Sequence, residues 1–167
     1  GKYDVVMNNI TQTPERAKKY NFSTPYIKSR YALIVPKDSK IKSLKQINGK
    51  KIVAGTGTNN ADVVKKYHGT LVPNGDFSNS LAMVKQGRAE GTVNSREAWY
   101  AYSKKNSTKG LKMIDVSSEA KPTKISALFN KKDSAIQSSY NQALKKLQKD
   151  GTVKKLSQKY FGEDVTE

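Results

Sequence analysis

The order of apolar and polar segments along the chain predicts an α/β fold. Short apolar blocks alternate with segments that carry helix start and stop signals. Glycine, proline or small polar residues follow most of the apolar blocks, as is typical of strands that end in loops. Because helices commonly connect neighbouring parallel strands, this β-α-β order also favours a mostly parallel sheet.

The first half of the chain begins with an apolar strand at residues 3–7. A short helix is expected to start at Thr13-Pro14-Glu15, because threonine suits the N-cap and proline suits the first turn. The elements expected next are a strand at 31–35, a short helix at 43–48, a strand at 51–54, a glycine-rich loop at 55–60, a helix at 61–67 and a strand at 70–72.

The second half continues the alternation with a helix at 78–86, in which Leu81 and Val84 share one face and Gly87 follows the end. A helix at 134–149 has apolar residues at helical spacing, and Asp150-Gly151 interrupts it. The other expected elements are strands at 91–94, 111–116 and 125–129, and helices at 96–104 and 153–160.

Composition narrows the class of protein. The 167 residues allow one domain or two small lobes, and no apolar run approaches the ~18 residues of a membrane span. With no cysteine and a single histidine, His68, we expect no metal site, cofactor or thiol chemistry. The sequence shows no secretory leader and begins at Gly1 without methionine, so we expect a processed product or a fragment.

The chain is strongly basic, with a formal net charge of +17. Such a surface attracts polyanions, including nucleic acid, anionic lipid, teichoic acid and sulfated glycans. The charge is almost all lysine and is spread over every segment, whereas a nucleic-acid site more often combines arginine with aromatic residues. The charge therefore indicates adhesion or a basic environment, and no specific nucleic-acid partner.

One candidate ligand site is the loop between the strand at 51–54 and the next helix. Its candidate residues are Gly55, Gly57, Thr58, Asn59 and Asn60. Free N–H groups at the helix start can hold a carboxylate or phosphate. The loop matches neither a P-loop nor a dinucleotide-binding fingerprint, and a plain tight turn explains its glycines equally well.

Two further strand ends carry polar residues. Residues 8–11 follow the first strand, and Arg16, one of four arginines, could reach back and bind a carboxylate, although it could also be a surface residue. Asn94 and Ser95 end another strand, where Ser95 also suits a helix N-cap. No paired carboxylates and no nucleophile with a base lie at these strand ends, so we expect no enzyme activity.

Several segments together resemble the extracytoplasmic solute-binding proteins of ABC importers for polar amino acids, the family 3 type. The segments are NNITQTPER (8–16), YNFSTPY (20–26), INGKKIVA with GTN (47–54 and 57–59), GRAEG (87–91), and LQKDGTV with KYFG (147–153 and 159–162). The resemblance covers essentially the whole chain. Within the family, the YNFSTPY run and the ending FGEDVT (161–166) are most similar to cystine-binding proteins.

The resemblance implies a two-lobed, type II periplasmic-binding-protein-like fold. Lobe two would be complete at 36–123, whereas 1–35 and 124–167 would be the remnant of a lobe one truncated at its N-terminus. Hinge strands would lie near 33–36 and 124–127. A truncated lobe exposes a sheet edge and apolar helix faces, so we expect self-association or origin from a longer parent.

The resemblance also assigns roles to the candidate residues. Arg16 would bind the α-carboxylate of the substrate, and Thr58 and Asn59 would add donors to it. Thr11 and the Asn9 carbonyl would take the α-ammonium group. The family usually has aspartate where this chain has Ser95, so either Glu97 or another group replaces that charge or amino-acid affinity is reduced.

The function that follows is non-catalytic binding of an amino acid, cystine by resemblance, between two lobes. The expected partners are the amino acid and the membrane permease of an ABC importer. The expected location is extracytoplasmic, on the surface of a bacterial cell or secreted, with a lipid-anchored parent. The alternative is a lysine-rich adhesin that binds collagen, mucin or cell-wall polyanions on the same scaffold.

Overall fold

The computed structural model describes residues 3–166, which divide into two compact units. Unit 1 contains the residues up to Ser29 and those from Thr123 onward, and unit 2 is Arg30–Pro122. The chain passes between the units at Ser29–Arg30 and at Pro122–Thr123. Leu33 lies inside unit 2, where it pairs on both sides within the sheet.

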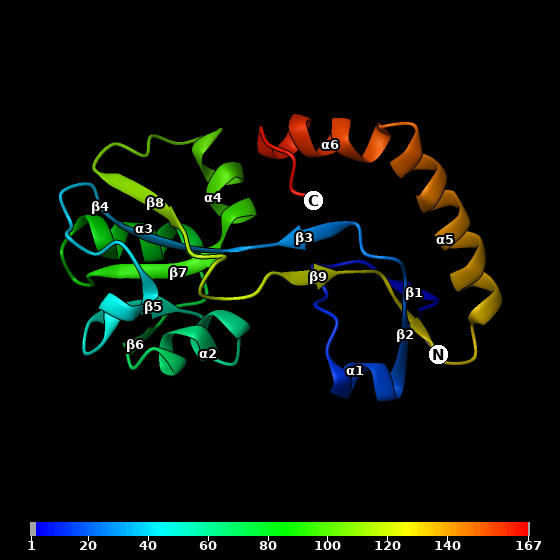
Figure 1. The fold of residues 1–167 in the computed structure, drawn as a ribbon, viewed down its shortest axis with the longest axis horizontal. Coiled ribbons are helices and arrows are strands. Elements are labelled where there is room, and N and C mark those ends of the chain that lie inside the picture. Colours follow the sequence, from blue (N-terminus) through cyan, green and yellow to red (C-terminus); the bar gives the residue numbers. More distant parts are fainter. Residues whose placement is uncertain (1–2, 167) are drawn as a thin grey trace. The chain divides into compact units, whose positions relative to one another are not determined.

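Within the described residues, unit 2 contains a five-stranded sheet with the strand order β6, β5, β7, β4 and β8 (Figure 1). In that order the strands are Thr70–Pro73, Lys51–Ala54, Gly91–Ser95, Tyr31–Pro36 and Leu111–Asp115. Strand β5 pairs in parallel with β6 and β7, whereas β4 pairs antiparallel with β7 and β8. Four strands therefore share one direction, and β4 between β7 and β8 runs against them.

The expectation of mostly parallel strands is correct for those four strands and wrong for the other pairings. Strand β4 is the first element of unit 2, and no βα unit within that unit precedes it to set its direction. In the described part of unit 1, every strand pairing is antiparallel.

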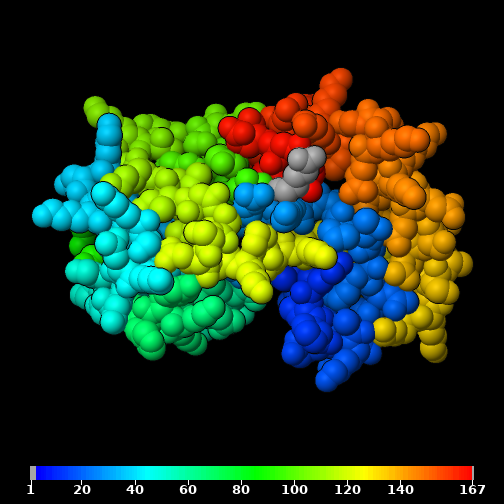
Figure 2. Space-filling model, viewed as in Figure 1, coloured from blue at the N-terminus to red at the C-terminus, as the bar shows by residue number. Residues whose placement is uncertain are grey.

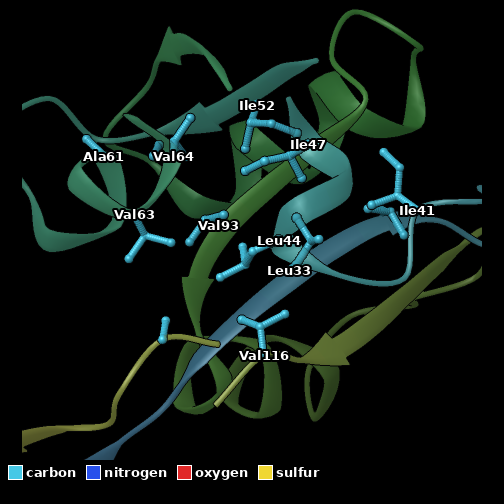
Figure 3. Close-up of a cluster of buried hydrophobic side chains, with 13 residues drawn as sticks. Leu33, Ile41, Leu44, Ile47, Ile52, Ala61, Val63, Val64, Val93 and Val116 are labelled. Atoms are coloured by element: carbon cyan, nitrogen blue, oxygen red, sulfur yellow. The ribbon is translucent and has the colours of Figure 1, made fainter. Parts of the chain in front are cut away.

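Helices cover both faces of the unit 2 sheet. They are the 3-10 helix η1 (Leu44–Ile47), α2 (Asn59–Lys66), α3 (Phe77–Lys85) and α4 (Arg96–Ser103). Alternate residues of β4 enter two separate cores, as the period of a strand requires. Leu33 packs with residues of η1 and α2, which Figure 3 shows gathered around it, and Ile34 packs with residues of α3 and α4. The predicted face of Leu81 and Val84 is confirmed, because both side chains are buried.

Unit 1 consists of short strands and helices. Its three-stranded sheet has the order β1 (Val5–Val6), β10 (Leu128–Asn130) and β2 (Tyr20–Phe22), within the described residues. A separate pair joins β3 (Ile27–Ser29) to β9 (Thr123–Ile125), and the helices are α1 (Pro14–Lys19), α5 (Ser134–Lys149) and α6 (Thr152–Phe161). The predicted break after α5 is confirmed, because Gly151 has φ +81° and only glycine adopts such a φ readily.

Two expectations for unit 1 are wrong in detail. The strand expected at 125–129 is divided into β9 and β10, because the two residues between them bond to other segments. The Ser126 N–H donates to the Ile10 carbonyl at 3.0 Å, and the Ala127 N–H donates to Ser23 Oγ at 2.9 Å. The first strand is also shorter than expected, covering Val5–Val6 of the expected residues 3–7.

The apolar stripe of α5 is only partly covered. Leu144 is buried and Tyr140 packs edge-on against Phe129, but Ile136 and Leu147 are 45% and 41% exposed. Figure 2 shows the atoms of α5 and α6, orange to red, at the surface of unit 1. The expectation that unit 1 presents apolar helix faces to solvent is therefore confirmed.

Candidate functional site

The first turn of α2 forms the best-defined binding feature of unit 2. Helix α2 begins at Asn59 rather than at residue 61, so Asn59 and Asn60 belong to the helix and not to the loop. Thr58 causes the early start, because its Oγ1 accepts the Ala61 N–H at 3.3 Å and donates to the Gly55 carbonyl at 2.7 Å.

The cap leaves donors available at the same helix end. The Asp62 N–H donates to the Thr58 carbonyl at 3.2 Å, and the Ala61 N–H is used by the cap. Within residues 3–166, the backbone N–H groups of Asn59 and Asn60 are therefore the ones that remain for a ligand or water. Together with the helix dipole, they suit a carboxylate or another anion.

The two glycines of the preceding loop have different roles. Gly57 has φ +72°, which favours glycine, and a side chain there would meet open space. Gly55 instead lies in a tight place, because a Cβ there would come 3.2 Å from the Thr58 methyl group and 3.6 Å from Gly75 Cα. The tight-turn explanation and the ligand explanation of this loop are thus compatible.

Strand pairing brings the second predicted site of unit 2 to the same edge of the sheet. Strands β5 and β7 are parallel neighbours, so the segment that follows each strand leaves the sheet at one edge. This edge carries the loop from Gly55 and the pair Asn94-Ser95. Tyr31 joins them, because it is the register partner of Ser95 in the pairing of β4 with β7.

Tyr31 lies at this edge, although the sequence did not single it out as a candidate residue. Burial raises the pKa of its phenol above the ordinary value of 10.0, and the charge of Asp62 raises it further. The side chain of Asn59 lies close enough to lower this pKa in part. The only sequence signal was an aromatic residue at the first position of a strand, which is too common to single out.

Ser95 serves as the N-cap of α4, as predicted. Its Oγ accepts the Ala98 N–H at 3.1 Å, and its own N–H donates to Asn94 Oδ1 at 2.8 Å. The short polar pair at the end of β7 therefore turns the chain into the helix. Ser95 is uncharged, so it provides no anion at this edge.

A group of charged residues lies where β7 and β8 end. Burial raises the pKa of the Asp115 carboxyl, but the Ser117 hydrogen bonds and the charges of Arg30 and Arg96 outweigh it, so this pKa is lowered. The Ser117 N–H donates to Asp115 Oδ1 at 2.8 Å. The surroundings of Asp115 thus favour its charged form. Glu97 lies nearby in sequence, in the first turn of α4, and is buried.

The predicted site residues of unit 1 lie on and before α1. Thr13 is the N-cap of α1, as predicted, and accepts the Arg16 N–H at 3.2 Å. Thr11 forms an isolated antiparallel bridge with Ile125, and Asn9 adopts a left-handed φ of +49°. The Arg16 guanidinium donates to the Thr11 carbonyl at 2.8 Å and is otherwise exposed, so it presents further N–H donors to solvent.

The candidate residues therefore fall into two groups. Unit 1 brings Asn9, Thr11 and Arg16 together, and unit 2 brings the start of α2 together with Asn94 and Ser95. Each group offers hydrogen-bond donors suited to a small anionic or zwitterionic molecule. None of the helices within residues 3–166 combines the length and the apolar content that a membrane-spanning helix needs.

The described residues thus form two α/β units, each with hydrogen-bond donors at the ends of its strands. The model of the bacterial extracellular solute-binding proteins, family 3, matches residues 1–163, and the chain belongs to this family.

Named relatives agree with the family. The chain is 33% identical to a probable amino-acid ABC transporter-binding protein of Haemophilus influenzae and 33% identical to the L-cystine-binding protein TcyJ of Bacillus subtilis. Each alignment covers 99% of this chain and 64% of the relative. The chain thus spans less than two thirds of the length of these relatives.

Solved structures confirm the type II periplasmic-binding-protein fold. The unliganded, open L-cystine solute receptor of Neisseria gonorrhoeae matches all of this chain and 71% of its own, with 32% identity and a TM-score of 0.79. A structure from work on glutathione import through GshT and the cystine ABC importer TcyBC of Streptococcus mutans has a TM-score of 0.85, with 30% identity. It matches 99% of this chain and 72% of its own.

Proposed function

We propose that this chain binds an amino acid, with cystine as the first candidate, as the substrate-binding part of an ABC importer. The observation that carries the proposal is the capped first turn of α2, whose Asn59 and Asn60 N–H groups suit a carboxylate. Family membership over residues 1–163 supports a solute-binding role, and relatives named for L-cystine support the substrate.

The proposed roles follow the chemistry of each unit. Arg16 of unit 1 binds the α-carboxylate, for which its planar guanidinium offers several donors. Thr58 and Asn59 of unit 2 add donors to the same group. Thr11 and the Asn9 carbonyl receive the α-ammonium. Closure of the two units about the crossing segments completes the binding in this proposal.

Calorimetry with a panel of amino acids that includes cystine tests the proposal. The chain and its Arg16→Ala variant are titrated side by side. Loss of a charged hydrogen bond typically costs about 1.5–3 kcal/mol, so we expect Arg16→Ala to weaken binding about tenfold to a hundredfold. If no amino acid produces heat or raises the melting temperature of the unchanged chain, the proposed function is wrong.

A matched control separates the guanidinium from the general charge of α1. Lys19 lies on the same helix, is exposed and has the same sign of charge. Lys19→Ala should leave affinity within about twofold, because an exposed lysine acts only through screened electrostatics. Equal losses in both variants would contradict a specific role for Arg16.

The partner of the transport function would be the membrane permease of the importer, and the location would be extracytoplasmic, as the family description supports. We also propose that a second copy of the chain covers apolar side chains that unit 1 exposes, among them Met7, Leu147 and Tyr160. Lipid anchoring of a longer parent remains part of the proposal.

The adhesin alternative starts from the net charge of +17 and draws no support from these relatives. Salt separates the two functions. Adhesion to a polyanion through lysines should weaken steeply between low and moderate salt, because the bound counterions are released. Binding of an amino acid through Arg16 and the α2 terminus should change much less.

A further inference from the structure

We infer that Gln12 is a positioning residue of the candidate site in unit 1, because it holds the segment that orients Arg16. The inference rests on the proposed function, in which the Arg16 guanidinium binds the α-carboxylate of an amino acid. Gln12 acts through its neighbours in the chain, since its own amide group bonds to the interior of unit 1.

Arg16 is held at two points, by the residues on either side of Gln12. The Arg16 guanidinium donates to the Thr11 carbonyl at 2.8 Å, and the Arg16 N–H donates to Thr13 Oγ1 at 3.2 Å. Both contacts lie at the start of α1, a helix of six residues that has no buried residue. Packing therefore contributes little to the position of α1, and the direction of Arg16 depends on how firmly residues 11–13 are held.

The side-chain amide of Gln12 connects these residues to a buried part of unit 1. Its Nε2 donates to Ser126 Oγ at 2.7 Å and to the Ser23 carbonyl at 3.3 Å. Ser126 is fully buried, and Ser23 is 3% exposed. A primary amide has two N–H donors, so one glutamine can bond to both acceptors at once. Because buried polar groups are nearly always paired, these acceptors favour the one position of the Gln12 side chain that reaches both.

The main chain around Gln12 is attached on the same side. The Gln12 N–H donates to the Lys124 carbonyl at 3.0 Å, and the Ser126 N–H donates to the Ile10 carbonyl at 3.0 Å. Thr11, which lies between them, forms an antiparallel bridge to the same segment. These main-chain bonds set the path of residues 10–12, and the side-chain bonds of Gln12 hold that path against the interior of unit 1.

Gln137 provides a comparison within the same unit. Its Nε2 donates to the Phe22 carbonyl at 2.6 Å, so it also joins two distant segments through a partly buried amide. Neither Gln137, in α5, nor Phe22, in β2, belongs to the segment that holds Arg16. Loss of either amide should destabilise unit 1, but only the loss of Gln12 should alter how a carboxylate is bound.

The test is calorimetry on the full chain with an amino acid that the unchanged chain binds and with its α-carboxamide, which lacks the negative charge. The unchanged chain should bind the amino acid about tenfold to a hundredfold more tightly than the carboxamide. Gln12→Met keeps the side-chain length and removes both donors. It should reduce this preference about threefold to tenfold, because misaligned charged hydrogen bonds are weaker. Gln137→Met, the matched control, should leave the preference within about twofold.

A second measurement tests whether Gln12 acts through Arg16. In the Arg16→Ala background, Gln12→Met should change the affinity for the amino acid by about twofold or less, because the guanidinium that Gln12 positions is absent. An equal loss of affinity in both backgrounds would overturn the inference. Should Gln12→Met not fold, Ser126→Ala removes the 2.7 Å hydrogen bond and leaves the glutamine in place, and it should reduce the preference about threefold.

The outcomes separate the inference from the proposed function. If the unchanged chain binds no amino acid, the proposed function itself is wrong, and the inference falls with it. If the chain binds and Gln12→Met keeps the preference for the amino acid over the carboxamide, only the inference is overturned. An equal reduction in Gln12→Met and Gln137→Met would also overturn it, because general loss of stability in unit 1 would then be the cause.

Discussion

Unit 2 and unit 1 differ in how completely they bury apolar side chains. In unit 2, both faces of the sheet are covered, and Leu33, Ile34 and Ile52 are fully buried. In the described part of unit 1, Phe129 and Val165 are buried to the same degree, whereas Ile125 and Leu144 are 5% and 7% exposed. All large hydrophobic residues that are exposed within residues 3–166 belong to unit 1: Tyr3, Val5, Val6, Met7, Tyr20, Ile136, Leu147, Leu156 and Tyr160.

This difference shows that the two units of one chain bury their own apolar side chains to different extents. A central sheet with helices on both faces gives each strand of unit 2 a covered environment. The short strands of unit 1 have few neighbours, and β1 and β2 lie at the edges of their sheet. We therefore expect substitutions to affect the two units unequally.

The largest effect should come from truncating a core leucine. Leu33→Ala removes a fully buried side chain from the sheet of unit 2 and should cost about 2–5 kcal/mol of unfolding free energy. Leu147→Ala makes the same chemical change at a position that is 41% exposed and should cost about 1 kcal/mol or less. Urea unfolding measures the loss of unfolding free energy in both variants. Equal losses would contradict the inferred difference in burial between the two units.

Loss of a helix cap should have the next largest effect. Thr58→Ala removes the cap of α2, which packs Ala61 and Val64 into the core, and should cost about 1 kcal/mol. Thr13→Ala removes the cap of α1, a six-residue helix with no buried residues, and should cost less. Thermal unfolding of the two variants decides the order, and a larger loss for Thr13→Ala would reverse the comparison.

A smaller effect concerns acid stability. The hydrogen bond from Lys50 lowers the pKa of Glu90 in unit 2, and the hydrogen bond from Thr166 lowers that of Asp164 in unit 1. A lowered pKa in the folded state stabilises the protein above the unfolded-state pKa, and this contribution is lost as the pH falls through the folded-state value. Both groups therefore favour folding at neutral pH and less so in acid.

Glu90→Gln tests the acid effect. The two side chains of the Lys50–Glu90 pair are 46% and 44% exposed, so water screens them and the loss should be about 1 kcal/mol or less at pH 7. At pH 3 the variant and the unchanged chain should approach each other in stability. A loss of the same size at both pH values would show that charge is not its cause. Asp164→Asn provides the parallel measurement in unit 1.

The smallest effect on unfolding should come from the exposed apolar residues of unit 1. Leu147→Gln and Leu156→Gln should change unfolding free energy by about 1 kcal/mol or less and should weaken self-association. Sedimentation velocity at several concentrations measures association. Lys146→Gln is the control on the same helix, and it should not weaken association. If the unchanged chain is monomeric at every concentration, the proposed second copy is wrong.

The sequence predicted the local features of unit 2 well, because they depend on neighbouring residues. Thr58 and Ser95 were recognisable as polar residues before a helix, although the start of α2 was placed two residues late. The direction of β4 was not predictable in this way, since it depends on pairing with β7 and β8 far along the chain. The sequence also did not predict strand β3, because it is only three residues long and its partner β9 lies far along the chain, at Thr123–Ile125.

The candidate site was predictable residue by residue but not as an arrangement. The glycine loop and the Asn94-Ser95 pair each had a local signal, whereas their position at one sheet edge depends on the pairing of β5 with β7. Tyr31 joins this arrangement because the pairing of β4 with β7 places it opposite Ser95. The buried Oε2 atom of Glu97 has no hydrogen-bond partner among residues 3–166, which is visible only in three dimensions, because sequence does not show which neighbours could bond to it.

The reversed strand β4 has a mechanical consequence. It begins directly after the crossing from unit 1, and it is hydrogen-bonded along both sides, to β7 and to β8. A load applied to the crossing therefore enters the sheet through an interior strand, as shear along two rows of hydrogen bonds that resist it together. Because Ser29 ends β3 and Tyr31 begins β4, Arg30 is the one residue between the two strands, and the chain at this point can turn most readily about the backbone torsions of Arg30.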